Sequence, residues 1–152
     1  MKHISRLSIR QQEVFVEYID RDSEAYDHVF SCFKLPKSTD EEKAARSAAI
    51  QEATRFAALV PMQVARNACE LMEIIADVAR LGNQNAITDA CVAMMAARSA
   101  VLGALLNVRI NLGSLKDKTF VDELKREADH LEQLACIREK ELLEVVNQEL
   151  NQ

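Results

Sequence analysis

The sequence predicts an all-α fold, an antiparallel bundle of long helices that forms one domain over residues 1–152. Hydrophobic residues make up 49% of the chain but aromatic residues only 5%, so Ala, Leu and Val must fill the interior. Three Gly and two Pro in the whole chain leave little material for turns. This composition favours long helices with short connections, and 152 residues are enough for one sizeable core.

The first helix is predicted from about Ser5 to Phe33 and is stopped by Pro36, because the residue before a proline avoids the helical region. The stretch STDEEK at 38–43 then starts a second helix. It offers two overlapping capping boxes, each with a Ser or Thr three residues before a Glu: Ser38 with Glu41, and Thr39 with Glu42.

The second helical pattern continues to about Leu81 and contains Pro61. A proline removes one helical hydrogen bond and clashes with the turn before it, so we expect this helix to be kinked or broken near Pro61. Gly82 takes the usual position after a helix end.

A third, strongly apolar helix is predicted from a cap at Thr88 to about Leu112, where Gly113 and Ser114 end it. A last amphipathic helix follows over about 116–148.

Charge and hydropathy argue against two classes of partner. The net charge is −5 and the acidic and basic residues are mixed, so no basic stripe is available for a nucleic acid. No apolar run in the sequence reaches the roughly 18–20 residues that span a bilayer. The first residues also lack the apolar stretch of a secretory signal. We therefore expect a cytoplasmic protein without nucleic-acid or membrane partners.

Cysteine and histidine spacing predicts no metal site. The four cysteines stand apart, which favours buried, reduced thiols over the alternative of a disulfide framework. The three histidines have no partner at metal-ligand spacing: His3, His28 and His130.

Asp22 is the anomalous residue of the first helix. On a helical wheel with Phe15 at zero, Asp22 falls at about −20°, among Phe33, Tyr26 and Ile19, whereas Asp20 falls at about 140°, on the polar side. A carboxylate on a core face must be paired, hydrogen-bonded or protonated. One interpretation is a structural bridge to a basic residue or a helix end, and the other is a general acid or base with a raised pKa.

The third helix carries a second anomaly, a lane that begins with an acid, continues with small residues and ends with two amides. Its members lie within about 40° of each other on the wheel: Asp89, Ala93, Ala96, Ala100, Gly103, Asn107 and Asn111. Small residues permit close helix packing or leave room for a flat ligand. The polar members fit the ligand interpretation better, because each brings donors or acceptors to a tight surface.

Basic residues gather near the first turn, where Lys34 and Lys37 flank Pro36 and Arg46 follows on the next helix. Such a group is either simply solvated or holds the anionic tail of a ligand.

Three stretches follow one another in a familiar order: DRDSEAYDHVFSCFKLPK, EEKAARSAAIQEATRFAALVP and GNQNAITDACVAMMAARSAVLGALLNVRINL. From about Val14 onward the chain resembles the formiminotransferase-cyclodeaminase C-terminal family. That family contains formimidoyltetrahydrofolate cyclodeaminases and methenyltetrahydrofolate cyclohydrolases.

The resemblance implies a catalytic aspartate in the D-x-D segment, which is Asp20 or Asp22 here, and the helical wheel selects Asp22. It also implies a folate site where helices and subunits meet. The positions that match the family's polar positions are predicted to bind substrate: Lys37, Arg46, Asn83, Asp89, Asn107 and Asn111.

Individual roles follow from the chemistry of the ligand. We expect Asp89 to accept hydrogen bonds from the pterin amino and ring N–H groups, and Asn107 and Asn111 to meet its carbonyl. The basic residues near the first turn suit the glutamate tail.

The implied activity is that of a cyclodeaminase, which converts 5-formiminotetrahydrofolate to 5,10-methenyltetrahydrofolate and ammonia in histidine degradation and one-carbon metabolism. Two alternatives stay open: a methenyltetrahydrofolate cyclohydrolase, and a non-catalytic helical fragment that binds folate or dimerises. No cofactor beyond the tetrahydrofolate substrate is expected. The expected partners are a folate derivative, including polyglutamylated forms, a second copy in a homodimer or higher homo-oligomer, and a functional link to glutamate formiminotransferase.

One departure from the family concerns the N-terminus. Family members begin with a helical segment that carries a Gly-rich PGGGS-type stretch, and the first dozen residues here do not resemble it. We therefore expect an N-terminally shortened member with an apolar face left uncovered, which favours oligomerisation.

Overall fold

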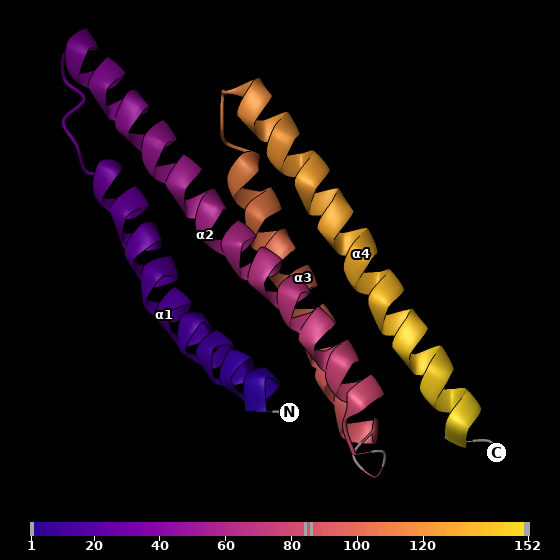
Figure 1. Ribbon diagram of the computed structural model, residues 1–152. Coiled ribbons are helices and arrows are strands. Elements are labelled where there is room, and N and C mark those ends of the chain that lie inside the picture. Colours follow the sequence, from indigo (N-terminus) through magenta and orange to yellow (C-terminus); the bar gives the residue numbers. More distant parts are fainter. Residues whose placement is uncertain (1, 84, 86, 151–152) are drawn as a thin grey trace.

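The computed structural model describes residues 2–83, 85 and 87–150, and within them all regular structure is helical. Four helices follow one another: α1 (Lys2–Cys32), α2 (Asp40–Leu81), α3 (Ile87–Leu112) and α4 (Lys118–Leu150). Consecutive helices run antiparallel, with α1 on one side of α2, α4 on the other and α3 behind (Figure 1). The predicted all-α bundle is confirmed.

The capping signals of α2 are confirmed. The Thr39 side chain accepts a hydrogen bond from the Glu42 N–H at 3.2 Å, and the Glu42 carboxylate accepts one from the Thr39 N–H at 3.2 Å. At the other end the Gly82 N–H donates to the Val78 carbonyl at 2.8 Å. Thr88 is not the cap of α3, since that helix already begins at Ile87.

Of the two alternatives expected at Pro61, the break is wrong, because α2 runs unbroken for 42 residues through it, and the kink stays a prediction. Pro61 has no N–H to give to the carbonyl of Ala57, one turn earlier. The Asn111 side chain of α3 supplies the missing donor, with Nδ2 3.2 Å from the Ala57 oxygen. A contact between distant segments therefore satisfies the carbonyl that proline leaves unpaired.

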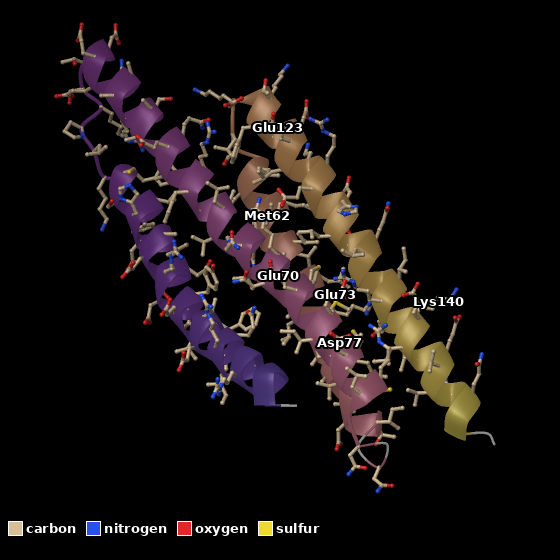
Figure 2. All side chains as sticks on the ribbon, viewed as in Figure 1. Met62, Glu70, Glu73, Asp77, Glu123 and Lys140 are labelled. Atoms are coloured by element: carbon tan, nitrogen blue, oxygen red, sulfur yellow. The ribbon has the colours of Figure 1, made fainter. Side chains whose placement is uncertain are left out.

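The main core lies between α2, α3 and α4. Its fully buried side chains include Met62, near the middle of α2 (Figure 2), together with Met72, Met94 and Leu105. A second, smaller cluster joins α1 to α2, and its buried members are Ala25, Ala57 and Val60. Helix α1 is thus attached through this smaller cluster and through Phe15, which packs against the main core.

Arginine ion pairs tie α4 to its neighbours. Arg138 of α4 donates to the Glu73 carboxylate of α2, at the boundary between the two helices (Figure 2). Two others connect α4 to α3: Arg98 with Glu139, and Arg109 with Asp129 and Glu132. No comparable ion pair joins α1 to α2 within the described residues.

Helix α3 is apolar beyond what the bundle covers. Val92, Leu106 and Ile110 are 65%, 65% and 76% exposed. Within Ile87–Leu112 a window of membrane-spanning length has a mean hydropathy of 1.7, and 39% of that window is buried. By length and composition the helix is therefore apolar enough to cross a membrane. Arg98 and Arg109 interrupt its apolar run, and the core helix of a soluble protein meets the same criterion.

The four cysteines carry free thiols, as expected. Cys32, Cys69 and Cys91 are buried and Cys136 is half-buried. Burial raises the pKa of the Cys69 and Cys91 thiols, so both are held in the protonated, unreactive form.

Candidate functional site

Asp22 and Asp20 both lie exposed on α1. The prediction that Asp22 sits on a buried stripe is wrong for the single chain, because Ile19 and Tyr26 of that stripe are 67% and 68% exposed. The face of α1 that contacts α2 is instead centred on Ala25, about 60° away from Asp22 on the helical wheel. A small residue permits the closest approach of two helices, so the contact follows Ala25 and not the large side chains.

Asp22 nevertheless lies at the level of the two amides of α3. It precedes Ala25 by one turn, and Ala25 clusters with Ala57 of α2. The Ala57 carbonyl in turn accepts the hydrogen bond from Asn111. By way of α2, Asp22, Asn107 and Asn111 therefore lie within about one helical turn of each other along the bundle axis.

The two amides make different contacts. Asn111 Nδ2 donates to the Ala57 carbonyl at 3.2 Å and to the Asn107 carbonyl at 3.0 Å. Asn107 Nδ2 donates to the Gly103 carbonyl of its own helix at 3.4 Å. Asn111 is half-buried and Asn107 exposed, so Asn111 is the more firmly held of the pair.

Asp89 and Asn83 lie at the far end of the bundle. Asp89 stands in the first turn of α3, 22 residues before Asn111, and that separation is about 33 Å at the rise of an α-helix. Asn83 lies in the connection before α3, where its Oδ1 accepts from the Asn85 N–H at 3.0 Å. One chain therefore cannot place Asp89 and Asn111 against the same pterin ring.

Lys37 and Arg46 lie at the opposite end, near the turn between α1 and α2. Arg46 donates from Nε and Nη2 to the Phe33 carbonyl at 3.2 and 3.0 Å, and its guanidinium lies 5.6 Å from the Phe33 ring centroid. Lys37 is exposed in the turn. Arg46 thus closes the end of α1, and Lys37 is the freer cation of the two.

Sequence reasoning missed a polar network that crosses three helices. The Asn67 side chain is 9% exposed, accepts from Gln63 at 3.2 Å and donates to the Tyr18 hydroxyl at 3.4 Å. Gln63 accepts from Arg66, which pairs with Glu127 of α4. A surface cavity of about 360 Å³ lies over this network. Its partners are up to 61 residues apart, so periodicity within one helix carried no signal for it.

No metal centre is evident among the residues that the structure describes, where no three His, Cys, Asp or Glu side chains gather.

Comparisons with known proteins identify the family. The family model described as formiminotransferase-cyclodeaminase matches residues 1–130. This match includes residues 1–13, so the resemblance extends further toward the N-terminus than the motifs indicated.

Relatives carry two different activities in their names. A methenyltetrahydrofolate cyclohydrolase of Methylorubrum extorquens is 36% identical over 151 residues, covering 99% of this chain and 73% of that protein. A formimidoyltransferase-cyclodeaminase of Rattus norvegicus is 34% identical over 117 residues, covering 77% of this chain and 22% of that protein. The chain thus spans about three quarters of the first relative and about a fifth of the second.

A solved structure has the same architecture. The formiminotetrahydrofolate cyclodeaminase of Thermotoga maritima superimposes with a TM-score of 0.74 at 25% identity, over 88% of this chain and 63% of that one. The chain therefore belongs to the formiminotransferase-cyclodeaminase family.

Proposed function

We propose that this protein is a folate enzyme that acts at the one-carbon bridge between N5 and N10, and that it hydrolyses 5,10-methenyltetrahydrofolate. The observation that carries this choice is the 36% identity to a methenyltetrahydrofolate cyclohydrolase over 99% of the chain. The motif string alone favoured the cyclodeaminase. That activity remains the second candidate, supported by the name of the structural relative and of the rat relative.

Hydrolysis requires one base and one acid near the bridge. Water adds its oxygen to the bridge carbon and gives up one proton, which leaves a hydroxyl group on that carbon. The bond from the carbon to N5 then breaks, the hydroxyl oxygen loses its remaining proton to become the formyl carbonyl, and N5 gains one proton. The net products are 10-formyltetrahydrofolate and one proton. A single carboxylate can take the proton from water and later return one to N5, and in this proposal Asp22 is that carboxylate.

Cyclodeamination uses the same groups in another order. N10 attacks the formimino carbon and loses its proton, and the imine nitrogen accepts one proton to become the amine of the adduct. That amine accepts a second proton and leaves as ammonia, which gives the methenyl product. Holding N10 beside that carbon is worth several kcal/mol by proximity alone. Both reactions therefore need a carboxylate close to the bridge and polar groups that hold the pterin.

The proposal includes a homodimer through the exposed face of α3. A heptad seam of exposed residues follows this helix, with large side chains toward the ends and small ones in the centre: Asp89, Val92, Ala96, Ser99, Gly103, Leu106 and Ile110. Antiparallel pairing of two such seams buries the exposed apolar side chains.

The same pairing accounts for the separation of the polar residues. Asp89 and Asn111 lie symmetrically about Ala100, so a twofold axis near Ala100 brings Asp89 of one copy to the level of Asn111 of the other. In this arrangement each pterin lies between two subunits and is held by Asp89 from one and by the amides from the other. A covered site also removes water from around Asp22, which favours proton transfer.

The test offers both substrates to the purified chain and follows the absorbance of the methenyl group. Loss of methenyltetrahydrofolate above the uncatalysed rate supports the cyclohydrolase. Formation of methenyltetrahydrofolate and ammonia from 5-formiminotetrahydrofolate supports the cyclodeaminase. Binding of tetrahydrofolate without either reaction supports the non-catalytic module and contradicts the proposed activity.

A further inference from the structure

The carbonyl of Ala57 has lost its helical partner. In an α-helix the N–H of residue 61 would donate to the carbonyl of residue 57, and Pro61 has none. Asn111, 54 residues away on α3, donates to this oxygen at 3.2 Å. The proline thus creates an acceptor in the middle of α2, and the amide of another helix is held against it.

Both amide protons of Asn111 are used within the fold. The second one goes to the Asn107 carbonyl at 3.0 Å. Only the NH2 group of the side chain can donate to two carbonyl oxygens, so the chemistry fixes which way the amide points. Its rotation is restricted by the same two bonds.

The oxygen of this amide is the group left over. Within the described part of the chain nothing donates to Asn111 Oδ1, and it is not among the buried atoms without a partner. It therefore reaches solvent as a fixed hydrogen-bond acceptor, one turn along the bundle from the level of Asp22.

We propose that Asn111 is a specificity residue that offers the ligand an acceptor only, and therefore receives an N–H of the 2-amino group of the pterin and not its carbonyl. This inference rests on the proposed folate function. It reverses the role that the sequence suggested for Asn111, since both of its donors are occupied. Pro61 acts as a positioning residue, because it leaves the carbonyl that holds the amide in place.

Asn107 has the complementary role. Its side chain donates one amide proton to the Gly103 carbonyl, and the second amide proton is available to a ligand. Of the two amides at this level, Asn107 is therefore the one that can donate to the pterin carbonyl. The Asn111 amide, in contrast, is already held in its binding geometry by two hydrogen bonds. It loses no further rotational freedom when the ligand arrives, which favours affinity.

The experiment uses the full chain, the variants Pro61→Ala and Asn111→Leu, and their combination. The urea midpoint of unfolding reports on the contact between the two helices. Asn111→Leu alone should lower the midpoint, because the Ala57 carbonyl loses its donor. In the Pro61→Ala background the same change should lower it much less, since the N–H of the new alanine takes over.

Ligand binding separates a specificity role from a structural one. We compare Pro61→Ala with the double variant, in which the helical bond replaces the lost amide. The double variant should bind tetrahydrofolate about threefold to tenfold more weakly. For an analogue with a methyl group in place of the 2-amino group, the two proteins should bind equally.

Equal affinity of the two proteins for tetrahydrofolate itself would overturn the specificity role and leave Asn111 as a structural residue. An equal loss of affinity for both ligands would overturn the assignment to the amino group. If the unsubstituted chain neither binds nor converts a folate, the proposed function is wrong and the ligand role falls with it. The urea midpoints decide the pairing of Pro61 with Asn111 independently.

Discussion

Arg66 of α2 donates two hydrogen bonds to Glu127 of α4, from Nε to Oε1 at 2.5 Å and from Nη2 to Oε2 at 2.7 Å. The planar guanidinium and carboxylate groups form a bidentate pair, which is the strongest geometry for an ion pair between arginine and a carboxylate. These hydrogen bonds hold the pKa of the Glu127 carboxyl below its ordinary value, while partial burial acts in the opposite direction.

Glu127→Gln should therefore weaken the fold at neutral pH but not in acid. A carboxyl whose pKa is lower in the folded state contributes stability above its unfolded pKa of about 4.3, and this contribution is lost as the pH falls through the folded pKa. Both side chains are about a third exposed. After allowance for solvent screening, we expect the free energy of unfolding to fall by about 1 kcal/mol at pH 7.

Urea denaturation at pH 7 and at pH 3 measures this difference. The control is Glu123→Gln, one turn earlier on α4 and exposed (Figure 2), which should leave stability within about 0.5 kcal/mol. An equal loss for Glu127→Gln at both pH values would contradict the assignment.

Asp22→Asn should abolish turnover, because the amide can neither take nor return the proton of the reacting water. We expect kcat to fall by about 10²–10⁴. Asp20→Asn is the matched control, two residues away on the same exposed helix, and should keep its rate within a few-fold. Methenyl absorbance under saturating substrate measures both. Loss in Asp20→Asn alone would transfer the role to the other aspartate.

Ala100→Glu should dissociate the proposed dimer. Ala100 follows the seam residue Ser99 and lies at the level of the proposed twofold axis, so the substitution brings two like charges close together across that axis, and such contacts cost several kcal/mol. Sedimentation velocity should show self-association weakened by more than about tenfold. Gln133→Glu, at an exposed position of α4, adds the same charge away from the seam and should leave the mass unchanged. A dimer that survives Ala100→Glu would rule out this interface.

Lys37→Ala and Arg46→Ala should separate binding from folding. Arg46 holds the Phe33 carbonyl, so its loss should cost about 1 kcal/mol of stability. Lys37 is exposed, and its loss should leave stability unchanged but raise KM for a polyglutamylated folate. Unfolding curves and KM values for both variants make the comparison. A larger effect of Arg46→Ala on KM would place the tail at Arg46 instead.

Local signals in the sequence were sufficient for the four helices and for both ends of α2, although not for the start of α3, where Thr88 is not the cap. Thr39 with Glu42, and Gly82, act through bonds that span three or four residues, so a short stretch of sequence contains all the partners. The continuity of α2 through Pro61 could not be predicted in this way, because the compensating donor is Asn111 of another helix.

The placement of the polar residues was only partly predictable. The helical wheel put Asp22 on the face with the largest side chains, whereas packing selects the face on which α2 can come closest, that of Ala25. A helical wheel also shows only the direction in which each side chain points and not its position along the helix axis. Asp89 and Asn111 share one lane, yet about 33 Å of helix separates them.

The separate attachment of α1 has a consequence for hydrogen exchange. The cluster that joins it to α2 has three buried residues, and Phe15 of α1 is only partly buried against the main core, which unites α2, α3 and α4. Elements held by few buried contacts open without unfolding the rest. The amides of α1 should then exchange with deuterium well before those of α2 and α3, so the helix that bears Asp22 can leave and re-form its contact while the remaining three stay folded.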